Sequence, residues 1–122
     1  MHNLIAGDLR IDVVESGPRD PIVLVWSGKS NHREPNKILG PYLAGAIGEA
    51  VDRKVPVELH FEKVDHFNSS TVTSIIQLIQ EARQKSVRLV FIYDQKLKWQ
   101  KLSFDALRVF DKGDDLLQLR SN

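Results

Sequence analysis

A short run of amide and hydroxyl side chains, Asn68-Ser69-Ser70-Thr71, is the stretch best suited to regulatory chemistry in this sequence. It lies where an alternating strand pattern gives way to a helical one, which predicts that these residues open a helix. The first backbone N–H groups of a helix lack partners within it and favour negative charge. Asn68 or Ser69 is therefore expected to be an N-cap, and a phosphate on Ser69 would gain backbone donors there.

Neighbouring titratable residues suggest two other chemistries, and the sequence favours neither. Asp65, His66 and Ser69 have the residue types of a hydrolytic triad, but no G-x-S-x-G motif surrounds the serine, and residues so close in sequence seldom form triads. His60 and Glu62, with Asp65 and His66, have metal-ligand types, yet their spacing matches no H-E-x-x-H motif. We predict no catalytic residue, no metal site and no cofactor.

Two motifs bear on phosphate and nucleic acid. Gly28-Lys29-Ser30 resembles the end of a P-loop, but Val23 occupies the position of its first glycine and no helical pattern follows. Lys96 to Lys101, KLKWQK, could stack on nucleic acid, although an amphipathic helix with Trp99 partly in the core is the commoner case. An exposed Trp99 would instead indicate a protein-docking surface. With 17 basic and 16 acidic residues the net charge is +1, so we predict no nucleic-acid partner.

Composition indicates a soluble globular protein. The 122 residues suffice for one core, so we expect a single domain over residues 1–122. There are no cysteines, which excludes disulfides and thiolate sites. The first residues lack the pattern of a secretion signal, and no apolar run has the length of a membrane span. A cytoplasmic location without membrane contact is the simplest expectation.

The order of periodic segments predicts an α/β fold. Strands are expected at residues 8–15, 21–27, 57–67 and 87–93, with an edge strand possible at 116–119, and helices from Pro41 to 54, over 70–85 and within 97–110. Turn formers at 16–21 predict an antiparallel hairpin, whereas the strand, helix and strand from 57 to 93 predict a parallel βαβ unit. We expect a mixed sheet of four or five strands, helices mainly on one face, and Ser103 as an internal N-cap in the last helical region.

The segments around Asn68-Ser69-Ser70-Thr71 resemble a known family. The stretch from Val57 to Phe110 resembles the STAS domain of bacterial anti-sigma factor antagonists, in which a strand ends in a D-S-S-G or D-S-T-G turn that opens a helix. Here the turn reads His66-Phe67-Asn68-Ser69-Ser70-Thr71-Val72-Thr73. The family's next strand matches Val87 to Tyr93, and its G-E-[IL]-D motif falls at Gly28 to Asn31. Asn68 and Asn31 replace the two family acids, and Thr71 and Thr73 replace small glycines.

The resemblance implies a STAS-like regulator that docks on a partner and is switched by phosphorylation. In that family, a serine kinase that is also an anti-sigma factor phosphorylates the serine after the acid, and a cognate phosphatase reverses it. By position the acceptor is Ser69, with Ser70 as second choice. The implied contact surface comprises Gly28, Asn31, Asn68, Ser69, Ser70, Thr71 and Thr73, with the exposed side of helix 70–85.

An alternative is open because the turn is also similar to that of small STAS-like proteins that bind and activate diguanylate cyclases. In this alternative the chain is a STAS-like scaffold or activating subunit. The cyclase is its partner and recognises the turn without phosphorylation. A small hydrolase is a third hypothesis, which would require a concave pocket with paired titratable groups.

Overall fold

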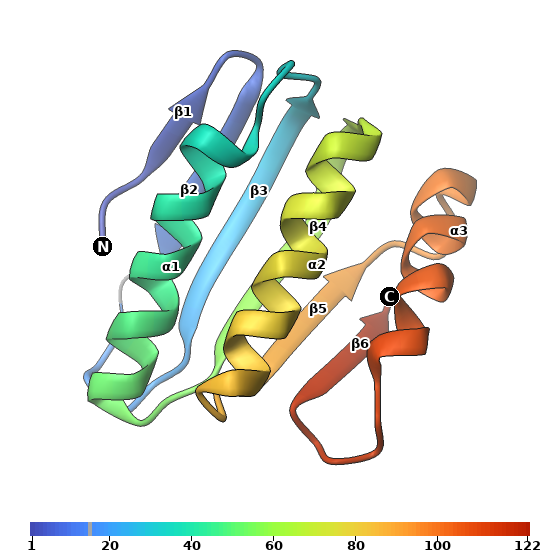
Figure 1. The fold of residues 1–122 in the computed structure, drawn as a ribbon. Coiled ribbons are helices and arrows are strands. Elements are labelled where there is room, and N and C mark those ends of the chain that lie inside the picture. The colour runs from blue at the N-terminus through green and yellow to red at the C-terminus, as the bar shows by residue number, and fades with distance from the viewer. Residues whose placement is uncertain (15) are drawn as a thin grey trace.

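The strands of the sheet follow one another in space in the order of the chain (Figure 1). The computed structural model describes residues 1–14 and 16–122, and these contain six strands and three α-helices. The strands are β1 (Leu4–Ala6), β2 (Leu9–Val14), β3 (Ile22–Ser30), β4 (Val57–Phe67), β5 (Leu89–Tyr93) and β6 (Leu117–Ser121). The helices are α1 (Asn36–Arg53), α2 (Ser69–Gln84) and α3 (Lys98–Leu107), and α3 continues into the short 3-10 helix η1 (Arg108–Phe110).

The sheet is mixed. β1, β2 and β3 are antiparallel neighbours, whereas β3, β4, β5 and β6 run parallel and are joined through the three α-helices. The predicted hairpin and the predicted parallel βαβ unit are both confirmed. The predicted number of strands, four or five, is too low, because β1 has only three residues and is too short to show an alternating pattern.

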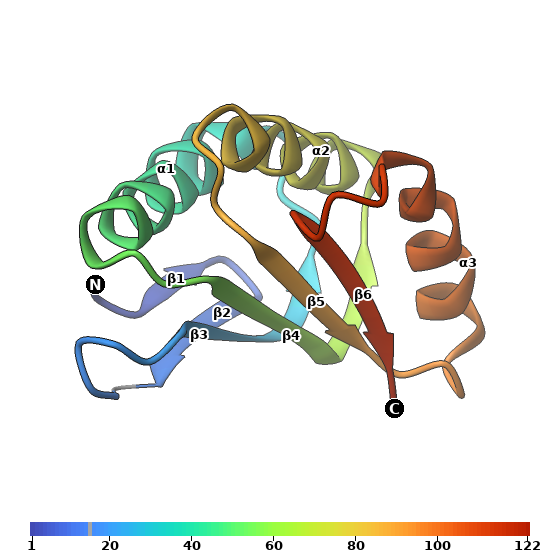
Figure 2. The same ribbon diagram turned by 90° about the horizontal axis from the view of Figure 1, so that it is seen from below.

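The helices gather on one side of the sheet. Figure 2 shows α1 and α2 side by side over one face, with α3 at the edge beside β6. Phe61 of β4 is fully buried and belongs to a cluster of aromatic side chains. Its ring centroid lies 5.0 Å from that of Trp26 and 5.0 Å from that of Phe104. The aromatic core therefore joins β3, β4 and α3, and α3 is part of the packed structure.

Helix α1 begins earlier than predicted. It starts at Asn36, and Pro41 lies inside it, where we expected the proline to mark the first turn. Proline normally disfavours helical geometry in the preceding residue by a clash that involves the Cβ of that residue, and Gly40 has no Cβ. The helix continues through Pro41, which lies in its second turn, and loses one backbone donor there.

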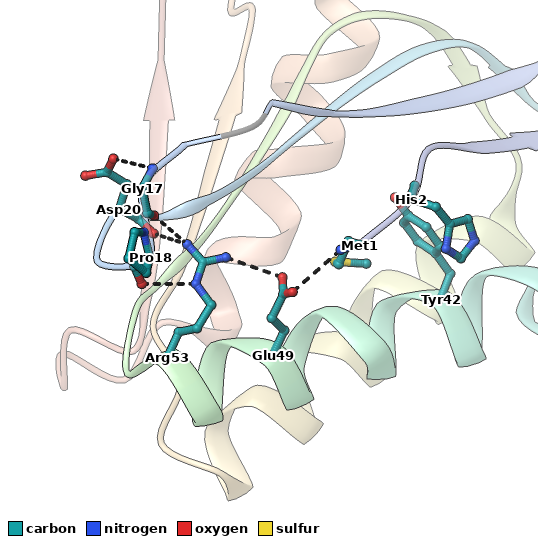
Figure 3. A network of polar contacts seen from close by, with 8 residues as sticks. All are labelled: Met1, His2, Gly17, Pro18, Asp20, Tyr42, Glu49 and Arg53. Atoms are coloured by element: carbon teal, nitrogen blue, oxygen red, sulfur yellow. Dashed lines mark hydrogen bonds and ion pairs between the residues drawn. The ribbon is translucent and has the colours of Figure 1, made fainter.

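A polar network ties the carboxyl end of α1 to the rest of the chain (Figure 3). The Arg53 guanidinium donates to the backbone oxygens of Gly17 at 2.8 Å, Pro18 at 3.1 Å and Asp20 at 3.0 Å, which fixes the approach to β3. Glu49 lies 3.4 Å from Arg53 and 3.5 Å from the ammonium group of Met1. A loop without regular structure is thus held by one side chain of α1.

Helix α3 buries a different set of residues from the one its pattern suggests. It runs unbroken through Ser103, so the predicted internal N-cap is wrong. Its buried residues are Gln100, Phe104 and Leu107, whereas Leu102 is exposed. Gln100 explains the difference: its Nε2 donates to the oxygens of Phe61 and Val64, at 2.8 and 3.0 Å, in the part of β4 beyond the last residue paired with β5. The buried amide replaces sheet partners that the strand lacks there.

Candidate functional site

The Asn68 turn lies at one end of the sheet, where β3 and β4 both finish. Ser30 and Phe67 are the last paired residues of these two parallel strands, and the Asn68 N–H donates to the Ser30 oxygen at 3.0 Å. The end of β3 and the start of α2, which are far apart in sequence, are therefore neighbours. We define the turn site as Gly28 to Asn31 together with Asn68 to Thr73.

Asn68 is the N-cap of α2. The sequence predicted either Asn68 or Ser69 as the cap, and the structure selects Asn68. Its Oδ1 accepts from the Thr71 N–H at 2.9 Å and from the Thr71 hydroxyl at 2.6 Å. Its Nδ2 donates to the backbone oxygen of His32 at 2.8 Å. An aspartate could make the first two contacts but not the third, which gives the amide at this position a physical role: it joins the start of α2 to the segment that follows β3.

Thr71 faces the interior, which the sequence did not indicate. Its side chain is fully buried, and its Oγ1 lies 2.6 Å from the Ser30 hydroxyl, which is also buried. A buried pair of hydroxyls that bond each other satisfies both groups and fixes the distance between β3 and α2. Thr71 is therefore inside the turn site and not on its surface. Sequence reasoning missed Ser30 as its partner, because only the parallel pairing of β3 with β4 brings the two together.

The exposed residues of the turn site are polar, and all of them except Lys29 are small. Asn31, Ser69, Ser70 and Thr73 are exposed, and the Thr73 hydroxyl donates to the Ser69 oxygen at 3.2 Å. The first turn of α2 holds no acidic residue, so nothing offsets the positive end of the helix dipole there. These side chains can donate and accept hydrogen bonds to a partner with little steric hindrance.

A shallow depression adjoins this surface between the start of α1 and the start of α2. Its volume is about 270 Å³, and it is lined by Arg33, Glu34, Pro35, Asn36, Ser70, Thr73 and Ser74. Ser70 and Thr73 open into it, whereas Ser69 is not among its lining residues. Arg33 is thus the cation that borders the depression, and no sequence motif marks it.

Gly28 has a structural reason for its identity. Its φ is +88°, and a Cβ at this position would lie 2.1 Å from the backbone oxygen of Asp8. The pairing of β3 with β4 is irregular on both sides of it, and the next residue, Lys29, donates its N–H to the same Asp8 oxygen at 3.0 Å. The glycine lets β3 bulge against the β1–β2 turn before it delivers Ser30 and Asn31 to the turn site.

The residues considered for a triad or a metal do not converge. Asp65 and His66 are successive exposed residues of β4 and so point to opposite faces of the sheet. His60 lies on the face opposite the helices, with its ring nitrogens 3.3 Å from Glu58 and 3.2 Å from Glu62. Within residues 1–14 and 16–122, no three or more His, Asp or Glu side chains are placed to hold a metal ion.

Trp99 is half-buried, as predicted for an amphipathic helix. Its ring packs edge-on against Phe67, with 5.4 Å between the centroids. Phe67 directly precedes Asn68, so α3 touches the residue that leads into the turn site. In the part of the chain that the structure describes, no helix is both long enough and apolar enough to cross a membrane.

Comparison with solved structures gives a likeness in fold. No family model and no curated protein matches the chain. Among solved structures, the crystal structure of the diguanylate cyclase SiaD in complex with its activator SiaC, from Pseudomonas aeruginosa, matches with a TM-score of 0.67 and 12% sequence identity, over 98% of this chain and 98% of the other. The neighbour, SiaC, has a STAS-like fold. At this identity the likeness concerns the fold alone, so the chain shares the architecture of that neighbour over nearly its whole length.

Proposed function

We propose that this protein is a non-enzymatic regulator that binds a signalling enzyme, such as a diguanylate cyclase, and activates it by docking. The observation that carries the proposal is the likeness in fold, over nearly the whole of both chains, to a protein described as the activator of a diguanylate cyclase. Of the two regulatory functions that the sequence suggested, the activating subunit has this support, and the anti-sigma factor antagonist has none of its own. The regulator would act in the cytoplasm, where the cyclase domain meets its nucleotide substrate.

The turn site supplies a suitable docking surface. Its exposed hydroxyl and amide groups are held on a rigid base by the Asn68 cap and by the buried Ser30–Thr71 pair. A pre-ordered surface loses little conformational entropy when a partner binds, which favours recognition of one geometry. Gly28, Asn31, Ser69, Ser70 and Thr73 remain the proposed contact region.

A binding measurement tests this surface. Thr73→Arg places a long cation on the exposed side of α2 beside Ser69, whereas Gln84→Arg places the same side chain on an exposed position at the other end of the helix. We expect Thr73→Arg to weaken binding to the cyclase by at least about tenfold, which is about 1.4 kcal/mol, and Gln84→Arg to bind like the wild type. Equal affinities for both variants would exclude the turn site as the contact.

A second function, a phosphorylation switch on the same surface, has a specific observation in its favour. Ser69 and Ser70 are exposed in the first turn of α2, which holds no acidic residue, and Ser70 opens into the depression bordered by Arg33. A phosphate there would find unpaired backbone donors and a guanidinium within the same region. It would also place about two negative charges on the surface that docks.

Mass measurement tests the switch. The chain is co-expressed with serine kinases of its own organism, and the mass of the wild type is compared with those of Ser69→Ala and Ser70→Ala. One added phosphate that Ser69→Ala abolishes would support Ser69, and one that only Ser70→Ala abolishes would move the switch to Ser70. An unmodified wild type with every kinase would refute the switch and leave the docking proposal standing.

A further inference from the structure

Helix α3 and η1 carry an apolar stripe that the fold does not cover. Leu102 is 63% exposed and Val109 is 74% exposed, and Ala106 between them is exposed as well. The spacing of four and three residues places the three side chains on one side of the helix. The opposite side is the one that packs into the core through Phe104 and Leu107. We name Leu102, Ala106 and Val109 the α3 stripe.

The charges that border the α3 stripe are mostly positive. Lys98, Lys101 and Arg108 are exposed. Asp105, the acid among them, is bound by Lys101 at 2.6 Å and by Arg108 at 3.5 Å. The acid is thus already neutralised within the helix, and the border keeps an excess of positive charge.

The stripe is presented by a firmly held element. Gln100 anchors α3 to β4 through two carbonyl oxygens, and Phe104 stacks on Tyr93 with 4.9 Å between ring centroids. Trp99 packs against Phe67 next to the turn site. A helix fixed on its inner side, with an apolar row on its outer side, has the form of a docking surface for another helix.

We propose that the α3 stripe binds an amphipathic helix of the partner protein, in which acidic residues flank the apolar seam. The apolar row would bury Leu102 and Val109, and the acids would meet the positive border around them. From Lys98 to Val109 the surface is about 17 Å long at 1.5 Å per residue, enough for about three turns of a partner helix. The proposal rests on the proposed function, because the same partner would contact both the turn site and the α3 stripe. The contact between Trp99 and Phe67 connects these two surfaces.

Site-specific photocrosslinking in living cells tests this inference with the full chain. Benzoylphenylalanine is introduced at position 102, at position 73 in the turn site, and at position 5 as the matched control. Ile5 is 71% exposed on β1, at the edge of the sheet far from α3 (Figure 1). We expect positions 102 and 73 to crosslink to one and the same protein, and position 5 to give no such product.

The crosslinked peptides decide the chemistry. Support requires that position 102 attach to a helical segment with an apolar seam flanked by Asp or Glu. Crosslinking from position 73 but not from 102, or from neither position, would overturn the stripe as a docking surface. A product at 102 with a second copy of this chain, with lipid, or with a segment that lacks acids would overturn it as well.

The outcome also separates this inference from the proposed function. If positions 102 and 73 both attach to an acidic amphipathic helix of a protein that is not a diguanylate cyclase, the stripe is confirmed and the choice of partner is wrong. Affinity measurements with the protein so identified complete the test: Leu102→Lys is expected to lower the affinity at least tenfold, and Ile5→Lys to leave it unchanged. Equal affinities for the two variants would contradict the proposal.

Discussion

At the scale of single residues, Asn68 sets the geometry of the turn site. It caps α2 with its oxygen and reaches the backbone of His32 with its nitrogen, so one side chain joins two segments that meet at the end of the sheet. Thr71 and Ser30 extend this arrangement into the interior. The contacts of Asn68, Thr71 and Ser30 therefore hold the exposed Ser69 and Ser70 in place.

Removal of the cap should be measurable. Asn68→Ala loses the acceptor for Thr71 and the donor to His32, and we expect it to lower the free energy of unfolding by about 1–2 kcal/mol. Asn68→Asp keeps the acceptor and adds a charge that the helix dipole favours, which offsets the lost donor. Urea unfolding followed by circular dichroism measures both. Equal losses for the two variants would show that the cap is not the dominant contribution.

Tyr42 gives a prediction about pH. Its hydroxyl donates to the His2 oxygen at 2.7 Å, and burial, with a smaller contribution from the charge of Asp12, raises its pKa to about 12 from the ordinary 10.0. Since the folded state holds this proton more tightly than the unfolded state, the contribution of Tyr42 to stability is complete below pH 10 and is lost as the pH rises towards 12.

The comparison with Tyr42→Phe isolates this effect. The free energy of unfolding of the wild type should decrease more steeply between pH 10 and pH 12 than that of the variant, which has no proton to lose at this position. Denaturant titrations at several pH values measure the two slopes. Parallel curves would contradict the burial of the hydroxyl.

At the scale of the elements, the sequence predicts those that have a clear period. β4, α2 and β5 follow from alternation and from a helical stripe, and their parallel arrangement follows from the length of the connection. The Asn68 cap is also readable, because an amide stands where the period changes. β1 is not readable, since three residues contain too little pattern.

The burial of α3 was less predictable for another reason. Its apolar residues fall on more than one side, so periodicity alone does not decide which side is buried. The decision comes from Gln100, a polar residue that is buried because β4 extends beyond its pairing with β5 and offers free carbonyl oxygens. Similarly, the Ser30–Thr71 contact depends on the register of two distant strands. Both are tertiary effects without a local pattern.

Two glycine substitutions test the bulge in β3. Gly28→Ala forces a Cβ against the Asp8 oxygen at a positive φ, and we expect it to destabilise the protein by about 2 kcal/mol or more. The control, Gly45→Ala, lies on the exposed side of α1 with no atom near its Cβ, and it should stabilise the helix by about 0.5–1 kcal/mol. Thermal unfolding compares them. A loss for both, or for neither, would contradict the strained approach at Gly28.

At the scale of the whole molecule, the proposed docking surface lies at one end of the sheet. The parallel strands β3 and β4 end together there, and the helices that follow them, α1 and α2, begin nearby (Figures 1 and 2). Helix α3 contacts the same end of the sheet, because its Trp99 packs against Phe67. The opposite end holds the Arg53 network, which fixes the hairpin and the first residues of the chain. The proposed docking surface and the Arg53 network therefore lie at opposite ends of the molecule.

The central claim is that docking of this chain activates a diguanylate cyclase. The most direct test is the initial rate of cyclic di-GMP formation from GTP by each purified diguanylate cyclase of the source organism, measured with increasing concentrations of this protein. For one cyclase, the rate should rise to a plateau with the wild type and with Gln84→Arg, and the rise should require at least about tenfold more Thr73→Arg. A rate that the protein leaves unchanged for every cyclase would contradict the claim.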